Sequence, residues 1–450
     1  MRPIGLGFQT AGHATLICYD GGPVLATDPW FDGPSAWGSW QLTHQVAKAQ
    51  RDAVEACPFL WISQDRSDHL HVPTLEGLSK GGRTVLVPDH RGGRMAAKLE
   101  RLGFSTRVLA DGEWVSLSDR IRVMSLSDIR LEAVLLVEVG GRLIVNTNEA
   151  GDRGIGELLQ RTIGEYEISY LLSGAGHEEP RIRTVDDEDL PCVTPPPPGP
   201  LGVGIETLMG LLGATYFVPL SRMRRHARED SAWANPHMLP ALAHHDGFWL
   251  EDKEVLPPFM HWDFESAGIT VLDPIENLDL PHPASAYGDD WSERLAPGES
   301  GLLDAYIRGI THLCRSLERV IFEVGGEAHE VRLEGDAGRG LRIHAPRASL
   351  MAAIHEERLG ELLRAGFVKV RLVGDWKTRE PSALSPDILP FLALAEAGGA
   401  KTPEEVRAHV ADYQARGLTA LERSGVEDRR LAVAFEPYMA AGLVQERGQE

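Results

Sequence analysis

Short apolar runs separated by glycine-containing turns fill the first third of the chain and predict β-strands. The runs at 14–19 and 23–27 flank Asp20-Gly21-Gly22, whose glycines accept the positive φ of a tight turn, so they are expected to form a hairpin. An amphipathic stretch at 95–102 predicts a helix. Further strand-like runs lie at 59–62, 84–87, 121–124, 168–172, 215–218, 133–139 and 143–145. Gly140-Gly141 joins the last two runs as a second hairpin. This alternation favours an α/β sandwich with mixed sheets.

A different pattern begins near residue 300 and predicts an α+β module with a helical tail over 300–450. Apolar residues at helical spacing indicate an amphipathic helix over 302–317. It is followed by strand-like runs at 320–324, 330–334, 341–345 and 368–373 and by a helix at 347–355. Thr402-Pro403 is typical of a helix start, with an N-cap and a first-turn proline. We therefore expect one α/β domain at 1–280 and a second unit at 300–450.

Two acidic and proline-rich segments interrupt these patterns. Residues 178–204 contain the run Asp186-Asp187-Glu188-Asp189 and four consecutive prolines. Charge combined with proline buries little surface, so we expect an exposed, flexible loop there. The polar stretch 281–299 is expected to separate the two units.

Composition narrows the function classes. The chain has 450 residues, 43% of them hydrophobic and 25% charged, which is typical of a globular protein large enough for two cores. A formal charge of −21 argues against nucleic acid as a partner, because phosphates require a basic surface. No apolar run approaches the roughly 20 residues that span a bilayer. The four cysteines form no CxxC pair, so we expect a reducing cytoplasmic location without a membrane partner.

The most informative polar residues lie in the loop after the apolar run 59–62. Gln64, Arg66, Asp68 and His69 alternate through this loop, and Pro73 is expected to open a helix behind it. Several segments fall in a recognisable order around the loop: Gly12-His13-Ala14-Thr15-Leu16, Thr27-Asp28-Pro29-Trp30-Phe31, Ser63 to His71, Asn146-Thr147-Asn148, Val218 to Ser221 and Arg228 to Asn235. Together they resemble the metallo-β-lactamase superfamily, and within it the branch that contains CMP-N-acetylneuraminate hydroxylase. The resemblance covers roughly residues 4–265 and, more weakly, the module.

The resemblance implies an αββα sandwich and a site built around two metal ions, but several ligand positions differ here. The family's motif begins with histidines where this chain has Gln64 and Arg66, whereas Asp68 and His69 match it. Arginine stays protonated and has no lone pair to give, so Arg66 is expected to place a fixed positive charge there and to partner Asp68 or Asp65. Other ligand positions read as Asn148 and Ser221.

Three readings of the site remain open. One is a rebuilt site for a single zinc or iron ion, with ligands drawn from Asp68, His69, His71, Glu149, His177 and His226. Another is a site without metal in which Arg66, Asp68 and His69 act on the substrate by charge and acid–base chemistry. The last is a binding protein without catalysis. Hydrolase-type chemistry is the family's default, and an iron-dependent hydroxylase is the alternative; the chain lacks Rieske ligands, so a hydroxylase would need a separate electron donor.

Candidate substrate contacts follow from charge and aromaticity. The cluster Arg222 to Arg228 is the one concentrated basic stretch of an acidic chain and favours a small anionic substrate. The candidate residues are Gln64, Trp30, Asn148, Arg224 and Arg225. Trp30 belongs to a glycine-rich loop with Trp37 and Trp40, which could stack on a flat substrate or pack onto its own domain. Asp28 is expected to orient the site loop, and Asp68 has a helix N-cap as its structural alternative.

Overall fold

The fold is described from a computed structural model. It describes residues 4–150, 155–174, 182–186, 188–192, 200–238, 241–335, 338–378, 381–384 and 388–424.

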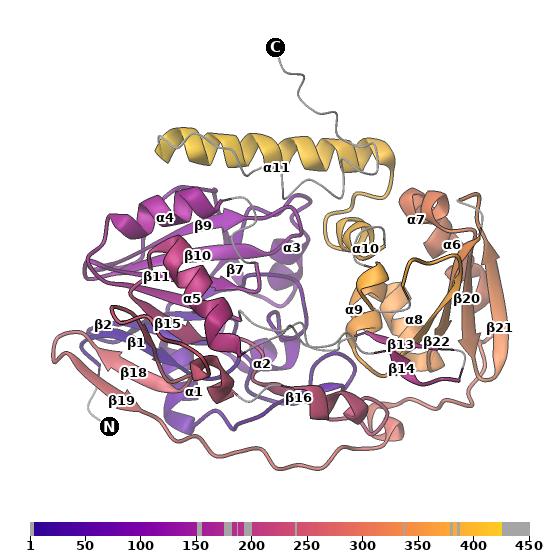
Figure 1. The fold of residues 1–450 in the computed structure, drawn as a ribbon, viewed down its shortest axis with the longest axis horizontal. Coiled ribbons are helices and arrows are strands. Elements are labelled where there is room, and N and C mark those ends of the chain that lie inside the picture. Colours follow the sequence, from indigo (N-terminus) through magenta and orange to yellow (C-terminus); the bar gives the residue numbers. More distant parts are fainter. Residues whose placement is uncertain are drawn as a thin grey trace.

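Two mixed β-sheets packed face to face form the larger part of the molecule (Figure 1). In the first sheet the order is β19 (Gly268–Val271), β18 (Met260–Asp263), β1 (Leu6–Thr10), β2 (Leu16–Asp20), β3 (Pro23–Thr27), β5 (Phe59–Trp61), β6 (Thr84–Pro88), β7 (Ser105–Leu109). In the second it is β17 (Glu254–Val255), β15 (Tyr216–Pro219), β12 (Ser169–Ser173), β11 (Arg142–Asn148), β10 (Ala133–Val139), β9 (Ile121–Ser127), β8 (Val115–Ser116). Both expected hairpins, β2–β3 and β10–β11, are present.

Helices cover the outer faces of both sheets and complete four αββα layers. The helices on the first sheet are α1 (Lys48–Ala56), α2 (Val72–Gly77) and α3 (Arg94–Arg101); those on the second are α4 (Gly156–Gly164) and α5 (Leu201–Leu212). Strand β10 shows how the sequence specifies these layers. Leu135 and Val137 point into the core between the sheets, whereas Val134 and Leu136 pack beneath α4 and α5. Such a strand is buried on both faces and therefore reads as a continuous apolar run.

The C-terminal part forms a separate module built on a third sheet. Its strand order is β14 (Pro191–Cys192), β13 (Arg183–Val185), β23 (Lys369–Gly374), β22 (Arg339–His344), β20 (Arg319–Val324), β21 (Glu327–Arg332). Its helices are α6 (Glu299–Gly309), α7 (Thr311–Ser316), α8 (Arg347–His355), α9 (Leu359–Arg364), α10 (Leu389–Glu396) and α11 (Pro403–Ser424). Short 3-10 helices lie at Ala232–His237, Ala241–His245, Ala284–Tyr287 and Pro381–Leu384. The fold is thus the expected αββα sandwich with a C-terminal α+β module.

Two expectations about local structure differ from what is found. The stretch 302–317 forms two helices, because the chain leaves the helical conformation at Ile310 and Thr311 donates its backbone N–H to Lys401 O over 3.0 Å. Within the segment expected to be a flexible loop, β13 and β14 form an edge of the module's sheet. Arg183 and Thr184 pair in parallel with Lys369 and Val370 of β23.

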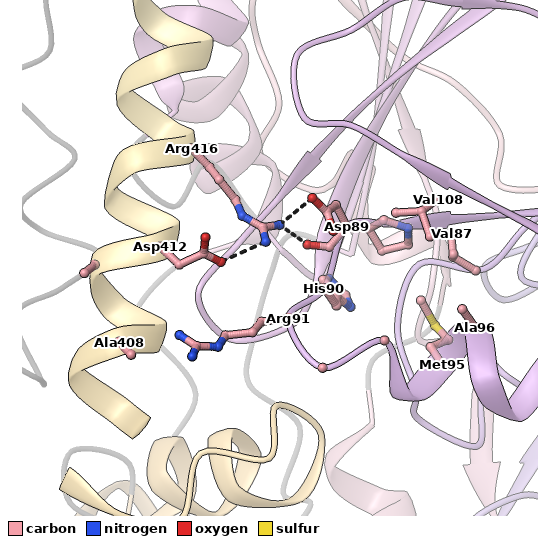
Figure 2. A pocket seen from close by; sticks show the side chains of 14 residues that line it. Val87, Asp89, His90, Arg91, Met95, Ala96, Val108, Ala408, Asp412 and Arg416 are labelled. Atoms are coloured by element: carbon pink, nitrogen blue, oxygen red, sulfur yellow. Dashed lines mark hydrogen bonds and ion pairs between the residues drawn. The ribbon is translucent and has the colours of Figure 1, made fainter. Parts of the chain in front are cut away.

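Helix α11 lies across one end of the sandwich, where Val406 and Val410 cluster with Ile129 and Leu131 and one ion pair reaches the sandwich (Figure 1). Arg416 forms ion pairs with Asp89 over 3.0 Å and with Asp412 over 2.8 Å. A cleft of about 730 Å³ remains between α11 and the loop that joins β6 to α3 (Figure 2). Among the described residues, no helix combines the length and the hydropathy that crossing a bilayer requires.

A buried carboxyl group in the module gives a testable pH dependence. Glu396 accepts hydrogen bonds from the Tyr306 hydroxyl and from Gly360 N, and burial raises its pKa from 4.5 to about 7. Because the folded pKa is the higher one, the folded state binds more protons, and stability falls as the pH rises from 4.5 to 7. The loss amounts to roughly 3 kcal/mol, since one pKa unit corresponds to about 1.4 kcal/mol.

We expect the Glu396→Gln variant to lack this decline and to melt at a higher temperature than wild type at pH 8. Melting temperatures measured across pH 4–8 check this. Glu404→Gln, which removes an exposed carboxylate paired with Arg407, is the matched control and should follow wild type. A parallel pH profile in Glu396→Gln and wild type would contradict the prediction.

Candidate active site

Loops from the strand ends of both sheets converge on one polar cluster. Asp28 follows β3, the 63–71 loop follows β5, Asn148 ends β11 and Ser221 follows β15. Asp28, Asn148 and Ser221 adopt positive φ values of 38°, 48° and 69°. Positive φ is uncommon for residues other than glycine, although Asn and Asp adopt it most readily, and such conformations concentrate at functional sites. The cluster is therefore the candidate active site.

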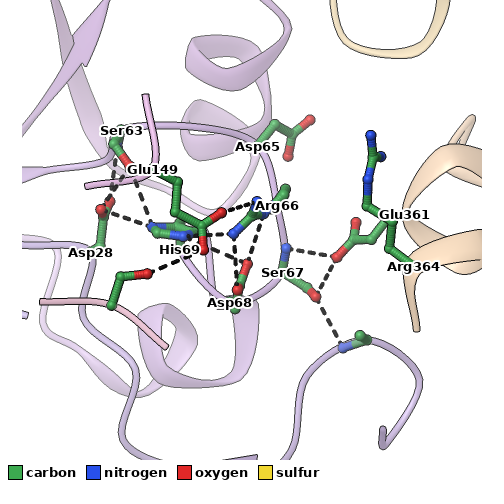
Figure 3. A network of polar contacts seen from close by, with 12 residues as sticks. Asp28, Ser63, Asp65, Arg66, Ser67, Asp68, His69, Glu149, Glu361 and Arg364 are labelled. Atoms are coloured by element: carbon green, nitrogen blue, oxygen red, sulfur yellow. Dashed lines mark hydrogen bonds and ion pairs between the residues drawn. The ribbon is translucent and has the colours of Figure 1, made fainter. Parts of the chain in front are cut away.

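The Arg66 guanidinium lies at the centre of this cluster (Figure 3). Its Nε and Nη2 donate to the two oxygens of Asp68, each over 3.1 Å, and its Nη1 donates to Glu149 Oε2 over 2.5 Å. Nη2 also lies 3.1 Å from His69 Nε2. Burial alone would lower the pKa of Arg66, but the charges of Asp68 and Glu149 outweigh it and raise the pKa. Arg66 is thus a permanent cation, and of the two expected partners it takes Asp68.

Asp68 is the fully buried anion of the cluster. Besides Arg66 it accepts a hydrogen bond from Arg224 Nη1 over 3.3 Å, and His13 Nε2 lies 3.4 Å from its Oδ2. Burial alone would raise its pKa, but the charge of Arg66 outweighs burial and holds the pKa well below the usual range. Asp68 does not cap α2; that helix begins after His71, whose Nδ1 accepts a hydrogen bond from Thr74 N.

His69 is oriented by polar groups on its Nδ1 side. Nδ1 lies 3.0 Å from Asp28 Oδ2, and Asn148 Nδ2 donates to that same oxygen over 3.1 Å. Asp28 also accepts hydrogen bonds from the backbone N–H and the hydroxyl of Ser63, so it orients the site loop as expected. Burial alone would lower the pKa of His69, but the charges of Asp68 and Asp28 raise it. His69 Nε2 can accept a hydrogen bond from Arg66 only if it carries no proton. In the neutral His69 ring the proton therefore lies on Nδ1.

Trp30 and the two histidines on either side of it form the floor beneath this cluster. The Trp30 ring is buried and packs edge-on against His13 and tilted against His71, with centroid distances of 5.2 and 5.5 Å. Burial lowers the pKa of His13 and of His71 to about 4, so both rings are neutral at pH 7. Trp30 was expected either to stack on a flat substrate or to pack onto its own domain, and it packs onto the domain.

The remaining candidates divide between the cluster and its surroundings. Gln64 is buried in the site loop, and Glu149 accepts a hydrogen bond from the Ser221 hydroxyl over 3.2 Å. The short β-ribbon of β4 (Trp40–Leu42) and β16 (Arg224–His226) places Arg224 over the Trp40 ring, 4.3 Å from its centroid.

Two of the substrate and metal candidates point elsewhere. Arg225 lies on the opposite face of β16, because side chains alternate along a strand, and donates to the Asp279 backbone carbonyl. His226 Nδ1 lies 3.3 Å from Ser39 Oγ, and Gly366 packs on its ring. His177 lies outside the described residues.

The ligand set expected for a single metal ion is rearranged. Among the described residues, one group has the spacing to hold a metal: His13, Asp68 and His69, with donor atoms within 4.8 Å of one another. His71 is used as a helix cap and Glu149 pairs with Arg66. His13 is absent from the expected ligands; its position beside a glycine at the entry to a strand was the available signal.

Arg66 decides whether this group fits a metal ion. Neither ring nitrogen of His13 makes a hydrogen bond among the described residues, so that ring keeps a lone pair to offer. The other two donors are already engaged, because both Asp68 oxygens accept from Arg66 and His69 Nε2 faces Nη2. A divalent ion would also meet the Arg66 and Arg224 charges on Asp68. The residues present therefore do not fit a metal while Arg66 holds this position.

The layers and this site define the architecture: an αββα sandwich with an arginine at the centre of a polar cluster at its strand ends. No protein-family model matches the chain. Cytidine monophosphate-N-acetylneuraminic acid hydroxylase from Danio rerio is 31% identical over 144 residues, which are 30% of this chain and 24% of that protein. The hydroxylase from Asterias rubens is 28% identical over 168 residues, 35% of this chain and 25% of that protein. The chain spans about a quarter of these relatives' length.

Two solved structures match somewhat more than half of the chain. An isothiocyanate hydrolase from Delia radicum gut bacteria matches with a TM-score of 0.37 at 16% identity, covering 59% of this chain and 98% of that one. The metallo-β-lactamase-fold protein YhfI from Bacillus subtilis matches with a TM-score of 0.32 at 10% identity, covering 57% and 98%.

Proposed function

We propose that this chain is a small-molecule enzyme with hydrolase-type chemistry on a small anionic substrate, and that it works without a metal. One observation carries the proposal: the Arg66 guanidinium occupies the centre of the site and engages Asp68, His69 and Glu149 at once. A fixed cation in a buried site can stabilise the negative charge that develops on the substrate during hydrolysis, which is the role a metal ion fills in other hydrolases.

Glu149 is the proposed general base. Its carboxylate is 7% exposed, lies against Arg66 and accepts a hydrogen bond from Ser221. It takes a proton from a water molecule as the water oxygen attacks the substrate's carbonyl or phosphoryl centre, and the proton then passes to the leaving group. Arg66 stabilises the oxygen that gains charge. Asp28 and Asn148 hold His69, and His69 with Asp68 keeps Arg66 in place.

A hydroxylase-type reaction is the second candidate, and the sequence similarity to hydroxylases over 144 residues favours it. That chemistry needs iron and an electron donor. Metal analysis separates the two candidates, because a hydroxylase should retain iron whereas the hydrolase proposed here should carry no stoichiometric metal.

The test is a panel of p-nitrophenyl carboxylic esters, phosphomonoesters and phosphodiesters, assayed with and without EDTA. We expect one ester class to be hydrolysed at a rate that EDTA leaves unchanged. Glu149→Gln should lower kcat about 100-fold or more, the range for loss of a general base. Glu113→Gln, a carboxylate outside the site loops, is the matched control. Activity that EDTA abolishes and zinc or iron restores would overturn the proposal, and binding without turnover would leave a metabolite-binding role.

A further inference from the structure

The C-terminal module contacts the site loop at the residue next to Arg66. Glu361, on α9, accepts hydrogen bonds at its Oε1 from Ser67 N over 2.9 Å and from Ser67 Oγ over 2.5 Å. Figure 3 shows this carboxylate facing the loop from the side opposite Asp28 and His69. Glu361 is 7% exposed, so its two bonds to Ser67 form in a largely dry interface where they are strong. The site loop is thus held between the sandwich and the module.

Ser67 joins three segments through one hydroxyl. Its Oγ donates to Glu361 and accepts a hydrogen bond from Ala36 N over 3.0 Å, in the loop that carries Trp30. Ala36 has a positive φ of 49°, which is unfavourable for alanine and requires support from outside its own loop. The hydroxyl and Glu361 therefore fix the two loops that border the candidate site.

A second contact strengthens the same connection. Arg358, at the start of α9, pairs with Glu361 and donates from Nη2 to the backbone carbonyl of Asp65 over 3.1 Å. Asp65 in turn forms ion pairs with Lys98 over 2.9 Å and with Arg94 over 3.4 Å, both on α3. The module thus holds the residue on each side of Arg66, one through its backbone carbonyl and the other through its backbone N–H.

We propose that Glu361 is a positioning residue that sets the placement of Arg66, and that the C-terminal module is therefore part of the active site. Only the catalytic consequence rests on the function proposed above; the positioning itself does not. Fixing Ser67 and Asp65 leaves the intervening backbone little freedom, so the guanidinium meets Asp68, His69 and Glu149 together. A shift of about 1 Å in such a group lowers turnover by as much as 100-fold.

The experiment compares amide hydrogen exchange of the full-length chain in three variants. Glu361→Gln weakens the carboxylate's bonds, and Ser67→Ala removes the hydroxyl while leaving the Arg358–Glu361 pair intact. Glu356→Gln is the matched control, because this 58% exposed carboxylate lies 3.8 Å from the same Arg358 without touching the loop. Residues 64–70 should exchange about tenfold faster in Glu361→Gln and by a smaller factor in Ser67→Ala, given the strength of such bonds. Exchange in α8 and in the Glu356→Gln control should stay as in wild type.

Two further readouts separate positioning from simple stabilisation. The 15N signals of the His69 ring, 3.1 Å from Arg66, should move in Glu361→Gln and Ser67→Ala but not in the control. Once a substrate is known, kcat should fall about tenfold or more with KM little changed, because Arg66 is displaced rather than removed.

The possible outcomes decide the two proposals separately. Unchanged exchange at 64–70 and unchanged His69 signals in both Ser67→Ala and Glu361→Gln would overturn the positioning role, even if Glu149→Gln abolishes activity. Faster exchange throughout α8 and the loop alike would also overturn it, since that result means general destabilisation. Local loosening in a chain that hydrolyses nothing would support the positioning role and refute the hydrolase.

Discussion

Replacing Arg66 with alanine is expected to give the protein a zinc site at His13, Asp68 and His69. Removal of the guanidinium frees Asp68 Oδ1 and His69 Nε2, and His13 already offers an unbonded ring nitrogen. These three residues then present two nitrogens and an oxygen within 4.8 Å of one another, a donor set that zinc accepts with water as the fourth ligand. Arg224 stays 3.3 Å from Asp68, so the affinity should be lower than in a site free of positive charge.

Without zinc, the same variant should be less stable by roughly 3 kcal/mol, because Asp68 and Glu149 lose a cation in a largely buried site. Zinc should recover much of that loss, since a ligand that binds only the folded state stabilises it. Equilibrium dialysis followed by elemental analysis measures the stoichiometry, and the melting temperature with and without zinc measures the linkage.

Two controls locate the new site. Arg225→Ala also removes one positive charge, but from outside the site, on the face of β16 opposite Arg224, and should bind no zinc. The double variant Arg66→Ala/His13→Gln should lose the zinc that the single variant gains. If Arg66→Ala binds no zinc, or if wild type retains a stoichiometric metal through Asp68, the role assigned to Arg66 is wrong.

The second large effect is expected at Asp68. The Asp68→Asn variant should lose about 3 to 5 kcal/mol at pH 7, because it leaves Arg66 and the buried Arg224 without their shared anion. The effect should depend on pH. The folded pKa of Asp68 lies well below its ordinary value of 3.8, so its stabilisation is complete above that value and is lost as the pH falls further.

Urea unfolding of wild type and Asp68→Asn between pH 3 and pH 7 measures both features. The gap between them should be constant above about pH 5 and should narrow toward pH 3, where Asp68 binds a proton in the unfolded wild-type chain while it stays ionised in the folded one. Asp52→Asn is the control, because the exposed Lys48–Asp52 pair should contribute less than about 1 kcal/mol. A gap that widens in acid would show that Asp68 is not held ionised by its arginines.

The layered fold could be predicted because its information is local. The run 133–139 is apolar at every position but one and forms β10 with the same bounds. Both faces of this strand are buried, so nearly every residue is apolar and the run is easy to recognise in the sequence. The run 302–317 was predicted as one helix because helical spacing continues through Ile310. The break there depends on a backbone bond to Lys401, which lies about 90 residues further along the chain.

The site could be predicted in part for the same reason. Arg66 and Asp68 are two residues apart, so their pairing followed from charge within one loop. The contact of His13 with Asp68 joins the turn between β1 and β2 to the loop after β5, and the contact of Glu361 with Ser67 joins residues 294 positions apart. Tertiary contacts of this kind leave no mark on the sequence around either residue. Two histidines were expected as metal ligands because His71 follows the motif in sequence and His226 lies near Ser221, but local structure uses both instead.

The pairing of β13 with β23 also has a consequence for how the chain can be divided. Strands β13 and β14 lie between the sandwich strands β12 and β15 in the sequence, yet the other strands of their own sheet all come from residues beyond 318. A fragment that ends near residue 280 would expose these two strands as unpaired edges, which invite aggregation, and a fragment that begins near residue 300 would lack one edge of its sheet. During synthesis β13 cannot pair with β23 until β23 has left the ribosome. We therefore expect the two units to be expressed and to unfold together, although they resemble separable domains.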